Sequence, residues 1–310
     1  MEVRITVIVP VWNREGLLRR ALDSIVFQSL KPLEIIVVDN NSSDSTFEVA
    51  QDWIKEHKEE GIILKLLKEE RPGACHARQK GLENAEGDFV IFFDSDDKMR
   101  PTMIESAVAT LSGNPDSDIV CWKCTIHQLD GSERIPTFMA DKPLEAHLIH
   151  ALLRPQGYMV RRDFIEKAGG WKKPVVVWND YELGLRLLLS NPKIVAIDNV
   201  LADIYAQEES ITGLNFSSKA GLWEKTLQEM EKELEKSDHT DKQRLIRIIT
   251  YRKAILASHY YREGNKKLAE ELMKKAVENS GFFEKAILRF SYIFTRSGLR
   301  GAWRLVRYFI

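Results

Sequence analysis

Apolar and polar positions in the first third of the chain follow two alternating periods. Short aliphatic runs predict strands at residues 5–9, 33–38, 62–67 and 89–93. Between these runs, apolar residues recur at three- and four-residue spacings and predict helices carrying Leu18, Leu22 and Ile25, then Val49, Trp53 and Ile54, then residues 74–85. Strands that alternate with helices through short connections predict an α/β, doubly wound domain with a mainly parallel sheet, whose strands end in polar residues.

The pattern changes in the second part of the chain. We predict a helix at 103–111, β-hairpin strands at 119–124 and 125–129 with the turn Asp130-Gly131, a strand at 158–160, a helix at 181–189 and a strand at 194–197. Beyond about residue 216 the apolar spacing is helical, with segments at 224–236, 242–259 and 266–279. We therefore expect one domain over residues 1–215, with halves at 1–100 and 101–215, and a C-terminal helical subdomain over 216–310.

Composition restricts the class of protein. The 310 residues are 44% hydrophobic, which is enough for a sizeable core, and a formal net charge of -1 gives no general reason to expect a nucleic-acid partner. Three cysteines cannot form an even disulfide framework, and no signal peptide precedes the first strand, so we expect a cytoplasmic protein. Cys121 and Cys124 have C-x-x-C spacing, and without a second pair we interpret them as strand residues.

Three carboxylates, Asp94, Asp96 and Asp97, directly follow the predicted strand at 89–93. In an open α/β sheet, ligands bind at the edge where such strands end. Carboxylates this close together raise one another's pKa unless a cation neutralises them, and oxygen ligands suit a divalent cation. The cluster therefore indicates either a cation site or a solvated acidic turn.

Further motifs stand in a fixed order around this cluster. The first strand ends in Val9-Pro10-Val11-Trp12-Asn13, the second in Val38-Asp39-Asn40-Asn41-Ser42-Ser43-Asp44, and residues 73–81 read GACHARQKG. Together with the acidic cluster, these segments resemble the motifs of the inverting family 2 glycosyltransferases over about residues 3–215. The resemblance implies a GT-A (Rossmann-like) fold that binds a nucleotide sugar. Gln79 replaces the family's usual Asn.

The resemblance also implies roles for residues of the first half. Those expected around the nucleoside are Pro10, Trp12, Asn13, Asp39 and Asn41, with Asp39 accepting a hydrogen bond from the base. Arg78 is expected to reach the diphosphate. Taken singly, Trp12 could be a core residue, Asp39 a helix cap and Arg78 a solvated helix residue.

For the acidic cluster, the resemblance implies that Asp94 faces the ribose or the metal and that Ser95 contacts the nucleotide sugar. Asp96, together with Asp94, is expected to bind Mn²⁺ or Mg²⁺. The segment from Tyr205 resembles a family segment that contains an Arg and a His, but this chain has neither there. A protein imidazole on the metal is therefore not expected from this segment.

The second half must supply a base, because an inverting transfer is a single displacement by an acceptor hydroxyl. Residues 178–186 resemble the family segment that carries the catalytic acid residue, which implies Asp180 as the general base, although Asn179 replaces the usual Glu. Either residue could instead cap the helix. Glu182 is the alternative base, and on a helix it points about 200° away from Asp180.

Two residues are expected near the acceptor. Trp178 could stack on a sugar ring or lie in the core, and Gly157 could let the backbone approach the acceptor.

From Lys285 onward every charged residue is basic, and aromatic residues lie between them. Such a helix can lie on an anionic membrane surface, which would make the protein peripheral on the inner face of the membrane. The alternative is a helix that packs on the protein with a solvated basic face. No apolar stretch approaches the roughly 20 residues that span a bilayer.

The resemblance implies a metal-dependent, inverting glycosyltransferase of the hexosyl- or N-acetylhexosaminyltransferase type, acting in cell-surface polysaccharide biosynthesis. The expected donor is a UDP-sugar, and the expected acceptor is a glycan or a lipid-linked acceptor. The alternative is a catalytically silent nucleotide- or glycan-binding module of the same fold. Asn179 and the missing Arg and His after Tyr205 are the features that favour this alternative.

Overall fold

The computed structural model describes residues 3–136, 142–172, 175–207, 216–278, 280–299 and 301–304. The chain forms two compact units. The first comprises Met1–Asp141, Leu153–Val176 and Ser190–Glu209, and the second comprises Lys142–Leu152, Val177–Leu189 and Ser210–Ile310. The predicted domain boundary at residue 215 lies outside the described residues and stays a prediction.

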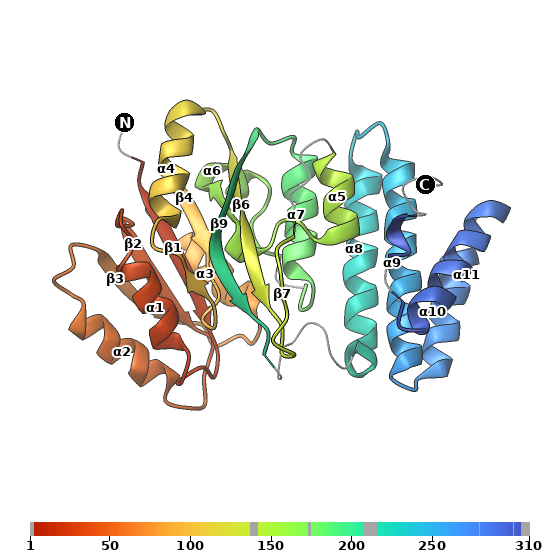
Figure 1. The fold of residues 1–310 in the computed structure, drawn as a ribbon, viewed down its shortest axis with the longest axis horizontal. Helices are drawn as coiled ribbons and strands as arrows, with labels where there is room; N and C mark the ends of the chain where they lie inside the picture. Colours follow the sequence, from red (N-terminus) through yellow and green to blue (C-terminus); the bar gives the residue numbers. More distant parts are fainter. Residues whose placement is uncertain are drawn as a thin grey trace. The chain divides into compact units, whose positions relative to one another are not determined.

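The first unit is built around one mixed sheet (Figure 1). Its strands are β1 (Ile5–Val11), β2 (Glu34–Asp39), β3 (Ile63–Lys68), β4 (Phe89–Phe92), β5 (Lys98–Met99), β6 (Ile119–His127), β7 (Glu133–Arg134), β8 (Tyr158–Arg161) and β9 (Ile194–Tyr205). Their order is β3-β2-β1-β4-β8-β6-β9-β5, with β7 paired to β6. Strands β1 to β4 pair in parallel, whereas β8 is antiparallel to both β4 and β6. The predicted α/β domain with a mainly parallel sheet is confirmed.

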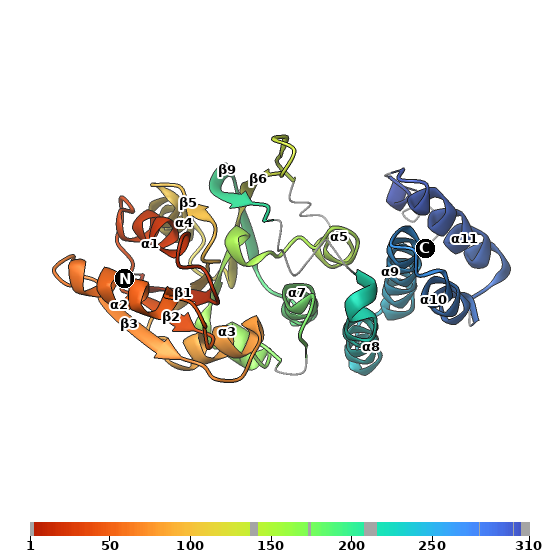
Figure 2. The ribbon, with the colours of Figure 1, turned by 90° about the horizontal axis from the view of Figure 1, so that it is seen from below.

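Helices cover both faces of this sheet. They are α1 (Leu18–Val26), α2 (Thr46–Glu56), α3 (Ala74–Glu83), α4 (Met103–Gly113) and α6 (Arg162–Lys167). Figure 2 shows α1 and α4 on one side of β1 and β2, and α3 on the other. Side chains alternate along a strand, so Val7 and Val9 of β1 join the core with α1, while Ile8 faces α3. There a Cβ on Gly81 would come within 2.3 Å of Ile8, so glycine lets α3 pack closely.

The predicted hairpin after residue 119 is only partly confirmed. The two strands predicted at 119–124 and 125–129 form one continuous strand, β6, because no turn residue separates them. The turn at Asp130-Gly131 is present, but its second strand, β7, has only two residues. Cys121 and Cys124 lie in β6 as buried free thiols, and burial raises the pKa of Cys124 to about 12. They are strand residues, as predicted.

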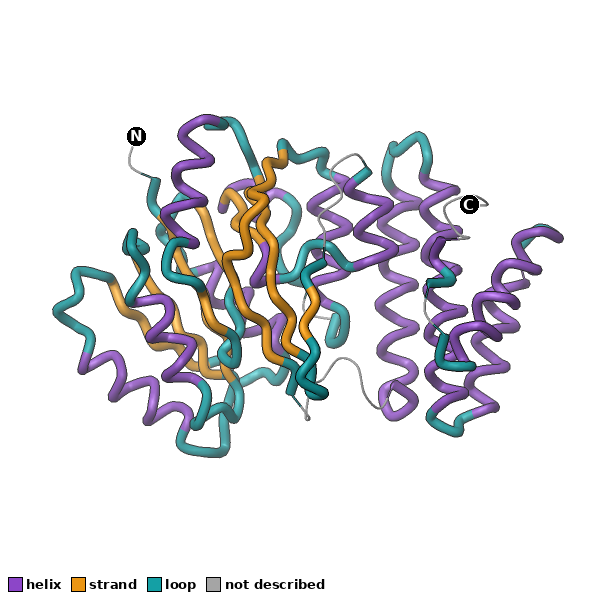
Figure 3. The backbone as a smooth tube through the Cα atoms, viewed as in Figure 1, coloured by secondary structure: helices purple, strands orange, loops and turns teal. Residues whose placement is uncertain are grey.

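The second unit is helical in its described part (Figure 3). Its helices are α5 (Pro143–His150), α7 (Asn179–Leu189), α8 (Ala220–Lys236), α9 (Lys242–Arg262), α10 (Lys266–Glu278) and α11 (Phe282–Arg296), and a short 3-10 turn, η2 (Phe216–Lys219), precedes α8. Another 3-10 turn, η1 (Pro155–Gly157), belongs to the first unit. Helices α8, α10 and α11 pack against α9. The helical segments predicted beyond residue 216 are therefore confirmed. In the part of the chain that the structure describes, no helix combines the length and apolar character needed to cross a membrane.

Candidate functional site

Polar residues that follow β1 and β2 form the first part of the candidate site. Asn13 and Asn41 have left-handed backbones, with φ of 48° and 61°, a conformation that Asn tolerates better than most residues. The backbone N–H of Asn13 donates to Ser42 Oγ at 3.0 Å, and Asn13 Oδ1 accepts the N–H of Ser43 at 2.8 Å. Asn13 therefore ties the turn after β1 to the loop after β2.

Asp39, the last residue of β2, carries an unused hydrogen-bond acceptor. Its Oδ2 accepts the N–H of Ser42 at 3.2 Å, but its Oδ1 is buried and has no hydrogen-bond partner among the described residues. A buried acceptor without a donor costs free energy, so this oxygen is suited to an N–H group of a ligand. In the pairing of β1 with β2, Pro10 lies opposite Val38, the residue before Asp39, and Pro10 is buried. Trp12 follows the end of β1, is 53% exposed and is not a core residue.

Arg78 on α3 is buried rather than solvated. Its Nη2 donates to Asp94 Oδ1 at 2.6 Å, and its guanidinium lies 4.8 Å from the ring centroid of Trp171. Gln79 accepts the N–H of Trp171 at 2.8 Å, and a Cβ on Gly170, whose φ is 57°, would come within 2.4 Å of Gln79 Oε1. Gln79 therefore fixes the turn that places Trp171 against Arg78.

The loop that leads into α3 is held by hydrogen bonds from Asn40. Its Nδ2 donates to the carbonyl of Arg71 at 2.7 Å, and its Oδ1 accepts the N–H of Gly73 at 2.7 Å. Glu69 accepts two bonds from the Arg71 guanidinium, both at 2.8 Å, and this contact lowers the pKa of Glu69 to about 2. The start of the Arg78 helix is thus fixed before any ligand binds.

Asp94, Asp96 and Asp97 lie together after β4 with incompletely balanced charge. Gln156 Nε2 donates to Asp94 Oδ2 at 2.6 Å and to Asp97 Oδ2 at 2.5 Å, and the N–H of Tyr205 donates to Asp97 Oδ1 at 2.9 Å. Burial, with the charge of Asp94, raises the pKa of Asp96. Burial, with the charges of Asp94 and Asp96, raises the pKa of Asp97 well above its usual range. This cluster is therefore suited to a cation.

Two arginines from the α1 region also contact this cluster. Arg14 Nε lies 3.5 Å from Asp96 Oδ2, and Arg20 donates to the backbone carbonyl of Asp96. Neither arginine nor Gln156 was predicted as a site residue. The only signals in the sequence are that Arg14 follows Asn13 and that Gln156 precedes Gly157.

The cluster does not form a complete metal site. Across the described ranges, no group of three or more His, Cys, Asp or Glu side chains is arranged to hold a metal ion. Asp94 and Asp96 do supply carboxylate oxygens, the ligands that Mg²⁺ prefers. The donor set therefore fits a divalent cation that takes its remaining ligands from a bound molecule or from water.

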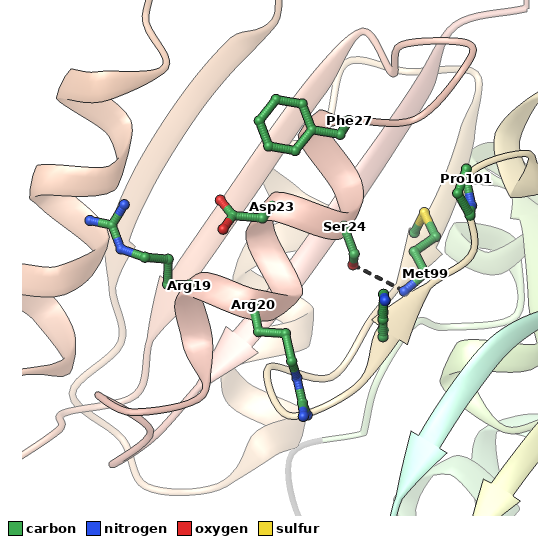
Figure 4. Close-up of a pocket in the computed structure, with 8 residues that line it drawn as sticks. Arg19, Arg20, Asp23, Ser24, Phe27, Met99 and Pro101 are labelled. Carbon is green, nitrogen blue, oxygen red and sulfur yellow. Dashed lines mark hydrogen bonds between the residues drawn. The ribbon is translucent and has the colours of Figure 1, made fainter.

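A pocket of about 490 Å³ lies beside the cluster, between α1 and β5 (Figure 4). Its lining includes Arg20, Ser24, Phe27 and Met99, and the N–H of Met99 donates to Ser24 Oγ at 3.0 Å. None of the predicted site residues lines this pocket. It therefore shares none of the predicted site residues, and it borders the acidic cluster through Arg20.

Asp180 lies in the first turn of α7, in the second unit, and is half-buried. The preceding Trp178 has a φ of 51°, which is strained for this residue, and its carbonyl accepts the N–H of Glu182 at 3.0 Å. Glu182, the alternative base, is 1% exposed and accepts two bonds from Arg186, at 2.7 and 2.8 Å. Glu182 is thus committed to a buried ion pair, which favours Asp180 as the reactive carboxylate.

The ring of Trp178 belongs to an aromatic cluster of the second unit. Its centroid lies 4.8 Å from that of Trp223, 6.0 Å from that of Tyr181 and 6.4 Å from that of Phe216. The Trp178 side chain is half-buried. The packing alternative for Trp178 therefore has direct support, and stacking on a sugar stays a prediction.

Helices α8 and α9 hold the segment that leads to Asp180. Thr226 Oγ1 on α8 donates to the carbonyl of Val177 at 2.8 Å. The guanidinium of Arg252 on α9 lies 5.4 Å from the ring centroid of Trp178 and 5.3 Å from that of Tyr181. The residues on both sides of Asp180 are therefore fixed by the C-terminal helices.

Gly157 ends η1 in the first unit. A Cβ added there would meet Cys124 Sγ at 3.7 Å and the carbonyl of Trp122 at 3.8 Å, which are ordinary van der Waals distances. Packing inside the protein therefore does not require glycine, and a role of Gly157 toward an acceptor stays a prediction.

Comparison with known proteins identifies relatives. A family model described as "Glycosyl transferase family 2" matches residues 6–167, more than half of the chain. The chain is 40% identical over 108 residues to the GalNAc(5)-diNAcBac-PP-undecaprenol beta-1,3-glucosyltransferase of Campylobacter jejuni. The matched region covers 35% of this chain and 33% of that protein. Three other curated relatives are matched over only 14%, 32% and 48% of their own lengths.

Solved structures share the fold. S. aureus TarS residues 1–349 in complex with UDP-GlcNAc has a TM-score of 0.74 at 18% identity, covering 96% of this chain and 92% of that chain. The mannosyltransferase PcManGT from Pyrobaculum calidifontis in complex with GDP-Man and Mn²⁺ has a TM-score of 0.57 at 20% identity, covering 95% of this chain and 81% of that chain. The resemblance found in the motifs is confirmed: the chain has a GT-A fold and belongs to glycosyl transferase family 2.

Proposed function

We propose that this chain transfers a sugar from a nucleoside diphosphate donor to a hydroxyl group of a glycan or lipid-linked acceptor, with inversion at the anomeric carbon. The observation that carries the proposal is the acidic cluster. Its negative charge is only partly balanced, although Arg78 contacts Asp94. Membership of glycosyl transferase family 2 supports the same class of reaction.

The nucleoside is bound by the residues after β1 and β2. Asp39 Oδ1 accepts an N–H of the base, which gives this buried oxygen the donor that it lacks. The exposed ring of Trp12 lies against the nucleoside, and Pro10, Asn13 and Asn41 shape the turns around it. Uracil carries an N–H of this kind, and TarS was solved with UDP-GlcNAc, so we propose a UDP-sugar as the donor.

The diphosphate and a divalent cation are bound at the acidic cluster. Asp96 and Asp94 would hold Mn²⁺ or Mg²⁺, with Ser95 between them, and Arg78 would donate to a phosphate oxygen. When bound, the cation neutralises the diphosphate and stabilises the departing nucleotide. Burial, together with the neighbouring carboxylates, raises the pKa values of Asp96 and Asp97, and this supports the assignment because a bound cation would offset both effects. PcManGT was solved with Mn²⁺.

Asp180 is the proposed general base. It takes the proton of the acceptor hydroxyl while the oxygen bonds to the anomeric carbon and the bond from that carbon to the phosphate oxygen breaks. Its place in the first turn of α7 stabilises the ionised form, because the positive end of the helix dipole lies there. Trp178 and Gly157 are the proposed acceptor contacts. The C. jejuni relative is named for an undecaprenol-linked acceptor, which supports a lipid-linked acceptor here.

A donor screen tests this proposal. The thermal stability of the protein is measured with each nucleoside diphosphate sugar, with Mn²⁺ and with EDTA, and nucleotide release is then measured for every donor that stabilises it. Stabilisation by a UDP-sugar with Mn²⁺ and release of UDP support the proposal. Stabilisation without release on any acceptor favours the silent binding module, and no stabilisation by any donor contradicts both functions.

A further inference from the structure

Helix α11 turns four large apolar side chains to solvent, and these residues form what we call the outer face of α11. They are Phe282, Phe283, Phe290 and Ile293, which are 84%, 78%, 47% and 50% exposed. On the opposite face Leu288 and Ser291 are fully buried, and α11 packs against α9 and α10. Contiguous exposed apolar surface of this kind marks a contact with a partner or a membrane.

Basic residues border the outer face along one edge. Lys285, Arg289 and Arg296 recur at intervals of four and seven residues, which places them on the same side of the helix. Arg289 is exposed, while the guanidinium of Arg296 lies 4.8 Å from the ring centroid of Tyr261. Glu284 is the only acidic residue between 280 and 299, where the structure describes every position, and it is half-buried. The edge is therefore uniformly basic.

The positive charge of the basic edge indicates whether a second copy of the chain or a lipid surface covers the outer face of α11. Two copies that met through the outer face would bring the same basic edge together, and α11 offers no acidic edge to balance it. An anionic bilayer supplies negative charge for the basic edge and an apolar layer just below it for the Phe rings. Because its other face is buried in the protein, α11 can present only this one face and lies flat.

We infer that the outer face of α11 docks on the surface of an anionic lipid bilayer, with Phe282 and Phe283 at the boundary between headgroups and acyl chains. The inference is independent of the proposed sugar transfer. The sequence predicted a basic C-terminal segment that could contact a membrane, and the inference assigns this contact to residues of α11 that the structure describes. The further basic residues Arg300 and Arg307 lie outside the described residues.

Co-sedimentation with vesicles tests this inference without nucleotide or acceptor. The full chain is mixed with phosphatidylcholine vesicles with or without phosphatidylserine, at low and high salt. We expect binding to the vesicles that contain phosphatidylserine, and weaker binding at high salt. Phe282→Ser with Phe283→Ser should weaken binding about tenfold or more, because buried Phe rings are lost. Arg289→Glu should weaken it about tenfold on anionic vesicles only.

Phe27→Ser is the matched control, since Phe27 is 60% exposed but lies in the first unit. It should bind vesicles like the unchanged protein, and circular dichroism should show all variants folded. The inference is overturned if the unchanged protein ignores anionic vesicles at low salt, or if the Phe282 and Phe283 changes weaken binding no more than Phe27→Ser does. It is also overturned if sedimentation velocity without lipid shows a dimer that the double Phe change abolishes.

Discussion

The guanidinium of Arg78 donates to the carboxylate of Asp94 at 2.6 Å, and the same carboxylate accepts from Gln156 at 2.6 Å. Asp94 is therefore already fixed in position by two donors. Arg78 is itself placed by the ring of Trp171. This relationship links the proposed diphosphate contact to the proposed cation ligand, so a change in Arg78 should affect both.

Arg78→Lys should keep the charge but lose the planar fork, because a lysine cannot contact Asp94 and a phosphate in the same geometry. We expect about tenfold weaker binding of UDP in the presence of Mn²⁺, measured by calorimetry. Lys31→Arg, an exposed change elsewhere in the first unit, is the control. Unchanged UDP affinity in Arg78→Lys would remove Arg78 from the donor site.

Binding of UDP should depend on a divalent cation. Without one, Asp94 and Asp96 face the diphosphate as like charges, so the affinity measured with EDTA should be much weaker than that with Mn²⁺. Asp96→Ala should stay folded and lose this dependence on the cation. Equal affinity of the unchanged protein in EDTA and in Mn²⁺ would show that no cation site exists here.

Glu69 gives a prediction for the dependence of stability on pH. Its pKa is lowered from 4.5 to about 2 by the hydrogen bonds from Arg71, so the pair stabilises the folded protein above pH 4.5, and this contribution is lost as the pH falls toward 2. Glu69→Gln should lower the free energy of unfolding by about 1 kcal/mol at neutral pH, since half-exposed Arg71 is screened by solvent. Urea unfolding should show the difference shrinking near pH 2. A constant difference across this range would exclude the ion pair as its cause.

Arg252 tests whether the C-terminal helices position the proposed base. Arg252→Met removes the cation that lies over Trp178 and Tyr181, on both sides of Asp180. We expect kcat to fall about tenfold with unchanged donor affinity, because a small misplacement of a reacting group is costly. Arg252→Lys should restore part of the rate. Lys253→Met, which breaks the 2.6 Å ion pair with Glu231 between α9 and α8, is the control and should leave kcat unchanged. Equal losses in both variants would mean only a general loosening of the helices.

The parts of the fold that rest on local patterns could be predicted from the sequence. Strands β1 to β4 and helices α1 to α3 were predicted because each strand and the helix after it carry their own apolar period. The placement of β8 between β4 and β6 could not be predicted, because its four residues pair antiparallel with segments far away in the chain. The two-residue strand β5 is too short to leave a pattern.

The same distinction holds for the candidate site. Asn13 and Asn41 belong to contiguous motifs, and the structure places them in turns with left-handed backbones. Gln156 contacts the acidic cluster from 59 and 62 positions away, which no motif or period can indicate. Glu182 was predictable only in part. Its i,i+4 spacing to Arg186 was visible in the sequence, but its burial was not.

Asp180 is the proposed base of the sugar transfer, and this role is tested most directly by measuring the rate of transfer by Asp180→Asn together with the affinity of this variant for the donor. The variant should fold and bind UDP with Mn²⁺ as the unchanged protein does, because Asp39, Arg78 and Asp96 belong to the other unit. Loss of a general base should lower kcat by about 10²–10⁴-fold. Glu182→Gln is the control: it perturbs the buried pair with Arg186 and should lower thermal stability more than kcat. Normal transfer by Asp180→Asn, on an acceptor that the unchanged protein uses, would contradict the account.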